Sequence, residues 1–154
     1  MVTVAITTRI GSALNGRFVS AALALPDLGE EMPRQVLLLD DSPIQLAARQ
    51  KVLSMAGLEV HVATNADSAL ALLRSETFRS NIGAIVTDHI MPEVSGPEFV
   101  SMLREIAPDL PIIVISGMAQ AEEEYTSFDN VVFRTKPMQP TELIELVKSK
   151  LDKQ

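Results

Sequence analysis

The stretch that decides the fold is QVLLLDDSP, residues 35–43. Val36 to Leu39 is an unbroken apolar run, which predicts a buried strand. Pro43 suits the first turn of a helix, which we expect to continue to about Ala56. Asp40 and Asp41 lie between the two. A buried strand that leads at once into a helix is typical of a parallel sheet with helices on both faces.

The same alternation of strand and helix continues along the chain. Further strands are expected at Leu58–Val62, Ile82–Thr87, Leu110–Ile115 and Val131–Thr135. Helices are expected after Asn65, from Pro97 to about Ala107, over the short glutamate-rich stretch Ala119–Tyr125, and at Pro140–Leu151. The apolar stripe of the first helix is expected to be formed by Ile44, Ala47, Ala48, Val52 and Met55. The seven methionines are scattered along the chain, and we expect them to fill space in the core. The pattern predicts an α/β domain with a doubly wound, five-stranded parallel sheet, a flavodoxin-like three-layer sandwich.

Composition and charge exclude several classes of function. The 154 residues, 47% of them hydrophobic, suffice for one core. The formal net charge is −7 and no Lys/Arg run stands out, so we expect no direct contact with nucleic acid. Without cysteine, disulfides and thiolate metal sites are not available. No apolar stretch approaches the roughly 20 residues that cross a bilayer, and we expect a cytoplasmic protein without membrane contact.

Four short motifs end four of the predicted strands. They are Leu39-Asp40-Asp41-Ser42, Val86-Thr87-Asp88, Val114-Ile115-Ser116-Gly117 and Phe133-Arg134-Thr135-Lys136-Pro137. The carboxyl ends of parallel strands converge on one crevice, so three carboxylates, a hydroxyl and an ammonium should share one small site. Taken singly, each motif could be ordinary cap or turn chemistry.

The chemistry of that set points to phosphoryl transfer. A carboxylate such as Asp88 can be phosphorylated in line if the charge of the phosphoryl group is neutralised. Magnesium does this with few carboxylate ligands, because it keeps several waters. The Ser116 hydroxyl and the Lys136 ammonium can hold the remaining phosphoryl oxygens.

These residues resemble the receiver domain of two-component response regulators, the CheY-like superfamily. The resemblance covers about Gln35 to Leu151, and residues 35–154 are expected to form the domain. It is carried by Asp40-Asp41, Asp88 with Met91-Pro92 and Gly96, Ser116-Gly117 and Lys136-Pro137.

The resemblance implies a role for each site residue. Asp88 would accept a phosphoryl group from a histidine kinase or a histidine phosphotransfer protein. Magnesium would be held by Asp41, Asp88 and the backbone carbonyl of Ile90, with Asp40 assisting through water. Ser116 would follow the phosphoryl group inward, and Phe133 would be the aromatic switch. The Lys136–Pro137 peptide would be cis. Such a protein is a signalling switch, not an enzyme on other substrates.

Two positions and one segment depart from the usual pattern of the family. The resemblance implies that Ile90 and Met118 flank the path of water to the phosphoryl group, and both are apolar. We therefore expect slow autodephosphorylation. The stretch between Ser116 and Lys136 is short, which thins the fourth helix of the family. A homodimer, where one forms, would use that helix, the fifth strand and the fifth helix. Only three residues follow Leu151, so we expect the output to be a protein contact or onward phosphotransfer.

Several alternatives remain open. Residues 1–34 are expected to be a flexible extension or linker; the stretch could also be the exit of an upstream kinase domain, or translation could begin at Met32. The chain could thus be the receiver of a hybrid histidine kinase. An aspartate-nucleophile phosphatase would want a second carboxylate two residues after Asp88, where Ile90 stands. His89 is expected to be a plain loop residue and not a metal ligand.

Overall fold

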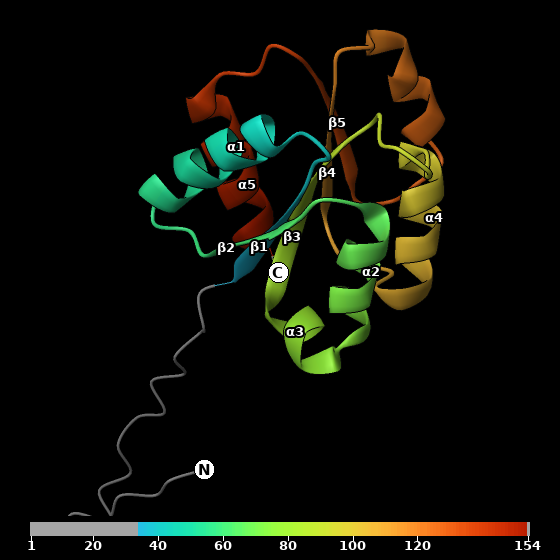
Figure 1. The fold of residues 1–154 in the computed structure, drawn as a ribbon, viewed down its shortest axis with the longest axis horizontal. Helices are drawn as coiled ribbons and strands as arrows, with labels where there is room; N and C mark the ends of the chain where they lie inside the picture. The colour runs from blue at the N-terminus through green and yellow to red at the C-terminus, as the bar shows by residue number, and fades with distance from the viewer. Residues whose placement is uncertain (1–33, 154) are drawn as a thin grey trace, which may run out of the picture. The chain divides into compact units, whose positions relative to one another are not determined.

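The computed structural model describes residues 34–153. Apart from Arg34, the extension expected at residues 1–34 lies outside the described residues. The described part is built on a five-stranded sheet in the order β2-β1-β3-β4-β5, with every neighbouring pair parallel (Figure 1). The strands are β1 (Gln35–Leu39), β2 (Val60–Ala63), β3 (Ile82–Asp88), β4 (Ile112–Ser116) and β5 (Val131–Thr135). The doubly wound, flavodoxin-like order predicted from the sequence is confirmed.

Helices cover both faces of this sheet. Figure 1 shows α1 (Pro43–Met55) and α5 (Pro140–Leu151) on one side. The other side carries α2 (Ala66–Arg74), α4 (Gly96–Ile106) and the 3-10 helix η1 (Ala119–Tyr125), with α3 (Glu76–Asn81) beside α2. Alternate residues of β1 serve the two layers: Val36 and Leu38 pack under α1 and α5, whereas Leu37 and Leu39 pack under α2 and α4. The sandwich therefore has two separate hydrophobic cores.

Side-chain caps begin four of the helices. The Asn65 carboxamide accepts a hydrogen bond from Ser68 N at 2.8 Å and starts α2, as its position in the sequence predicted. Ser42 and Ser95 cap α1 and α4 in the same way. Ser75 caps α3, a short helix that the sequence analysis did not predict. No α3 residue is fully buried, so its sequence lacks the apolar period that marks the longer helices.

The inward face of α1 differs from the one predicted. Ile44 and Met55 are 82% and 80% exposed, and the helix buries Leu46 and Leu53 instead. Leu46 and Leu53 are seven residues apart, about two helical turns, so they share one face of α1, and that face packs on the sheet. The expectation that methionines fill the core also fails at Met55 and at Met118, which is 40% exposed.

The structure also bears on the membrane expectation. Within residues 34–153, no helix is long and apolar enough to span a lipid bilayer.

Candidate functional site

The register of the parallel strands gathers the predicted site residues at one edge of the sheet. Leu39 of β1 lies opposite Thr87 of β3, so the following residues, Asp40 and Asp88, are lateral neighbours. Asp88 in turn lies opposite Ile115 of β4, one residue before Ser116. Ser116 pairs with Thr135 of β5, and Lys136 comes next. The polar residues at the carboxyl ends of β1, β3, β4 and β5 thus lie in one crevice at this edge of the sheet, as expected.

Asp88 and Lys136 form the centre of this crevice. Lys136 Nζ lies 2.7 Å from Asp88 Oδ2, and the Asp88 side chain is only 9% exposed. The other carboxylate oxygen, Oδ1, accepts a long hydrogen bond of 3.4 Å from Ile90 N. The peptide between Lys136 and Pro137 is cis, as the resemblance implied. The ammonium is therefore held against one oxygen of Asp88, while the second is weakly engaged.

Asp40 is bound on both of its oxygens by the protein. Its Oδ1 accepts from Ser42 N at 2.8 Å, and Arg49 Nη1 lies 2.6 Å from Oδ2. Burial raises the pKa of Asp40 and the charge of Asp88 adds to the rise, while the Ser42 N–H and the Arg49 guanidinium oppose it. The Asp40 side chain is only 1% exposed. Its ion pair with Arg49 offsets the free-energy cost of burying the carboxylate charge.

Gln45 and Arg49 are site residues that the sequence analysis missed. Gln45 Oε1 accepts from Lys136 Nζ at 3.0 Å and from Arg49 Nη2 at 3.2 Å. The amide therefore links the lysine beside Asp88 to the arginine beside Asp40. One signal was present in the sequence: the two polar residues are four apart on α1, which places them on one face of the helix.

The oxygen atoms that could hold a cation come from Asp41 and Asp88. Asp41 is exposed, and within residues 34–153 its carboxylate takes part in no hydrogen bond or ion pair. The same residues contain no preassembled group of three His, Asp or Glu side chains for a metal ion. Magnesium often uses one or two protein carboxylates and keeps several waters, so the carboxylates of Asp41 and Asp88 suit it chemically.

Ser116 and Phe133, the two expected switch residues, are both buried. Ser116 is fully buried, and its Oγ accepts from Met118 N at 3.0 Å. Phe133 is 7% exposed and its ring lies 5.7 Å from that of Tyr125. The side chains of Ile90 and Met118, which follow Asp88 and Ser116 by two residues, are 59% and 40% exposed.

His89 is a loop residue, as expected, but its side chain also makes a buried contact. It lies in the bend after β3 but is only 9% exposed. Its Nδ1 is 2.6 Å from the hydroxyl of Tyr125, a residue that the sequence analysis did not single out. The available signals were the position of His89 next to Asp88 and the fact that Tyr125 is the one tyrosine of the chain.

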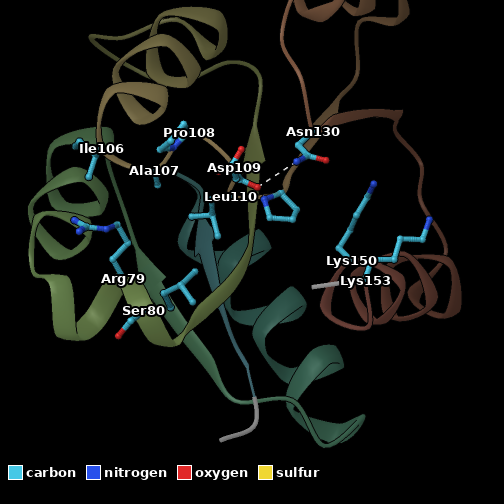
Figure 2. Close-up of a pocket in the computed structure, with 12 residues that line it drawn as sticks. Arg79, Ser80, Ile106, Ala107, Pro108, Asp109, Leu110, Asn130, Lys150 and Lys153 are labelled. Atoms are coloured by element: carbon cyan, nitrogen blue, oxygen red, sulfur yellow. Dashed lines mark hydrogen bonds between the residues drawn. The ribbon is translucent and has the colours of Figure 1, made fainter. Parts of the chain in front are cut away.

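Apart from the carboxylate crevice, a pocket of about 590 Å³ lies at the other end of the sheet, where the strands begin. Figure 2 shows Arg79, Ser80, Lys150 and Lys153 around it, and the Asn130 amide donating to the backbone carbonyl of Asp109. Its wall includes Ile82, the first residue of β3, whereas Asp88 is the last. A seven-residue strand is about 20 Å long, so this cavity is separate from the carboxylate crevice.

Comparisons with known proteins agree with this geometry. Residues 36–148 match the family described as response regulator receiver domain. The two-component response regulator ORR11 of Oryza sativa is 32% identical over 110 residues, which span 70% of this chain and 73% of that protein. The sensor kinase CckA of Brucella abortus is 30% identical over 121 residues, 77% of this chain but only 13% of that protein.

Solved structures show the same likeness. A response regulator receiver protein from Sinorhizobium medicae superposes with a TM-score of 0.69 at 28% identity and covers 79% of this chain and 97% of its own. The receiver domain of the hybrid histidine kinase CckA has a TM-score of 0.62 at 27% identity, covering 76% and 98%. The chain therefore belongs to the receiver domain family of two-component response regulators. Receiver domains of this family act as signalling switches in phosphorelays.

Proposed function

We propose that Asp88 accepts a phosphoryl group from a phosphohistidine and that the chain signals through altered protein contacts. The observation that carries the proposal is the buried Asp88 carboxylate with the Lys136 ammonium 2.7 Å away, at the edge where Asp40 and Ser116 also end their strands. A fixed cation beside a nucleophilic carboxylate stabilises the charge that develops on the transferred group.

In the proposed reaction, a carboxylate oxygen of Asp88 forms a bond to phosphorus while the phosphorus–nitrogen bond of the phosphohistidine breaks. The imidazole leaves with the electron pair of that bond. Lys136 already holds Oδ2, which leaves the weakly engaged Oδ1 as the better placed nucleophile. After transfer, the Lys136 ammonium and the Ser116 hydroxyl would bind phosphoryl oxygens.

Magnesium is the cation that we propose for this site. Asp41, Asp88 and the backbone carbonyl of Ile90 would hold it, with Asp40 in a supporting place because Arg49 already binds it. When bound, the ion neutralises phosphoryl oxygens. Every other contribution comes from the chain: Lys136 orients the carboxylate and Gln45 orients Lys136.

The partners follow from this chemistry. A histidine kinase or a histidine phosphotransfer protein would donate the phosphoryl group, and a protein that distinguishes the two states would receive the signal. Because histidine kinases take phosphate from ATP, we place the exchange in the cytoplasm. We propose no enzymatic activity beyond phosphorylation and dephosphorylation of Asp88 itself, since the phosphatase alternative needs a carboxylate where Ile90 stands.

A second candidate role is that of a receiver in a hybrid kinase, passing its phosphoryl group onward. The likeness to the receiver domain of the hybrid histidine kinase CckA favours it. The two roles differ in the fate of the group: onward transfer to an added histidine phosphotransfer domain supports the relay, whereas retention supports a terminal switch.

Acetyl phosphate with magnesium tests the proposal without the cognate kinase. Intact mass spectrometry should show one added phosphoryl group on the wild-type chain and none on Asp88→Asn. Asp129→Asn, an exposed aspartate after η1, is the matched control and should be modified normally. An unmodified wild-type chain, or modification that persists in Asp88→Asn, would refute the assignment of Asp88.

A further inference from the structure

His89 ties the phosphoacceptor loop to the neighbouring strand. It directly follows Asp88, and its backbone N–H donates to the carbonyl of Ile115 on β4 at 3.1 Å. Its carbonyl accepts from Gly96 N, also at 3.1 Å, at the start of α4. The backbone of His89 is thus held by hydrogen bonds on both sides, directly beside Asp88.

The side chain of His89 is held by Tyr125 of η1. The Nδ1–hydroxyl distance is 2.6 Å, and the two rings meet edge to face with centroids 5.7 Å apart. Glu124 Oε1 lies 4.0 Å from the other ring nitrogen, Nε2. Tyr125 is 4% exposed, and burial raises the pKa of its hydroxyl, so the O–H is retained at neutral pH.

Tyr125 in turn packs on the aromatic switch residue. Its ring and that of Phe133 are 5.7 Å apart and tilted by 33°. Phe133 stands on β5 three residues before Lys136, which contacts Asp88. A path therefore leads from Asp88 along the chain to His89, through side-chain contacts to Tyr125 and Phe133, along the chain to Lys136, and back to Asp88.

Gly96 makes room for this arrangement. A Cβ at Gly96 would overlap the Tyr125 hydroxyl oxygen and come within 3.0 Å of the His89 carbonyl oxygen. The tyrosine hydroxyl thus fills the space that the missing side chain leaves, between the phosphoacceptor loop and α4. The hydroxyl is enclosed by both segments and has little room to move while its bond to His89 is made.

We propose that Tyr125 is a positioning residue, which through its hydrogen bond to His89 holds Phe133 buried and couples it to Asp88. The inference rests on the proposed function of Asp88. A phosphoryl group on Asp88 is expected to draw Ser116 inward, and the Phe133 ring would then fill the space that Ser116 leaves. Phe133 is already buried, so the bond between Tyr125 and His89 favours the arrangement that the phosphoryl group requires. A receiver domain that already populates the conformation with Phe133 buried accepts the phosphoryl group faster, because a smaller fraction of the molecules has to change conformation first.

The test compares the rate constant of modification by acetyl phosphate and magnesium in matched variants. Tyr125→Phe and His89→Phe remove the hydrogen bond and keep a ring. Thr126→Val removes a hydroxyl from the next residue, which donates to the backbone carbonyl of Glu123. We expect each of the first two to slow modification roughly fivefold, as the loss of one buried hydrogen bond allows. The double variant should be no slower than either, and Thr126→Val should keep the wild-type rate.

A second readout separates positioning from simple stabilisation. In amide NMR spectra without a phosphoryl donor, Tyr125→Phe should shift the Asp88 and Ile90 resonances as well as that of Phe133. A wild-type rate in Tyr125→Phe, even with a lowered melting temperature, or shifts confined to η1, would overturn the proposal. If the wild-type chain takes no phosphoryl group, the proposed function fails instead, and the NMR comparison alone decides the coupling.

Discussion

The ammonium of Lys136 lies between two oxygen acceptors, the carboxylate of Asp88 and the amide of Gln45. The second acceptor restricts where a long, flexible lysine places its charge. This matters because a misplaced ammonium gives up much of the electrostatic stabilisation of a transferred phosphoryl group. Gln45 therefore contributes to the site although it is not charged.

Gln45→Met tests this contribution at nearly constant side-chain size. We expect a modification rate several-fold lower and a free energy of unfolding lower by about 1 kcal/mol, because Lys136 and Arg49 both lose an acceptor. The measurements are acetyl phosphate kinetics and urea unfolding. Gln50→Met, on the same helix, is the control. Equal behaviour of both variants and the wild type would show that Gln45 does not orient Lys136.

We expect Ile90 and Met118 to determine how long a phosphoryl group stays on Asp88. Both side chains are exposed and apolar, so neither can orient a water molecule by hydrogen bonding. We expect slow release of phosphate from the loaded wild-type chain and, in Ile90→Asn, release faster by about tenfold. Phosphate release after removal of the donor measures both. Loss from the wild-type chain within seconds would contradict this explanation.

At the scale of the elements, η1 and the start of α4 approach each other closely at Gly96. Gly96→Ala should lower the free energy of unfolding by about 2 kcal/mol, since the new methyl group meets the Tyr125 hydroxyl. Combination with Tyr125→Phe should recover part of that loss, because the overlapping atom is then absent. Chemical denaturation measures the free energy of unfolding of the single and the double variant.

Gly117→Ala is the matched control for Gly96→Ala. A Cβ at Gly117 would meet nothing within 4 Å, so this variant should be as stable as the wild type. If Gly96→Ala proves equally harmless, the packing of Tyr125 against α4 is looser than the structure indicates.

The strands and longer helices were predictable because burial leaves a strong pattern. Continuous runs such as Ile82–Val86 are buried on both faces and carry no polar residue, and β5 and α5 have the bounds that the sequence predicted. The predicted strands for β2 and β4 both began two residues too early, β2 at the partly buried edge of the sheet and β4 where the apolar run already includes Leu110 and Pro111. The exposed helix α3 was missed because no residue in it is fully buried.

Within the site, the groups attached to strand ends were predictable and those from helices were not. Asp88, Ser116 and Lys136 follow apolar runs, so topology alone brings them together. Gln45 on α1 and Tyr125 on η1 enter the site through helix rotation and side-chain reach, which a single sequence does not specify. Their contacts with Lys136 and His89 depend on packing in three dimensions.

Across the whole molecule, the stability of the domain is linked to the ionisation of its one tyrosine. Burial holds the pKa of Tyr125 well above its ordinary value of 10.0. Unfolded chains lose this proton at about pH 10, whereas the folded chain keeps it. Stability should therefore be unaffected below about pH 10 and fall as the pH rises above it.

Tyrosinate absorbance and urea unfolding between about pH 8 and pH 11 measure this linkage. Tyr125→Phe should lose the part of the alkaline destabilisation that the tyrosine causes. A folded wild-type chain whose tyrosine titrates at its ordinary value would contradict the burial of the hydroxyl.

The central claim is that a phosphoryl group is attached to Asp88 and to no other carboxylate of the crevice. Borohydride reduction of the acetyl phosphate-treated chain, followed by peptide mass spectrometry, identifies the acylated residue directly, because it converts an aspartyl phosphate to homoserine. We predict homoserine at residue 88 alone, with magnesium required. Homoserine at residue 40 or 41, or at none of the three, would contradict the account.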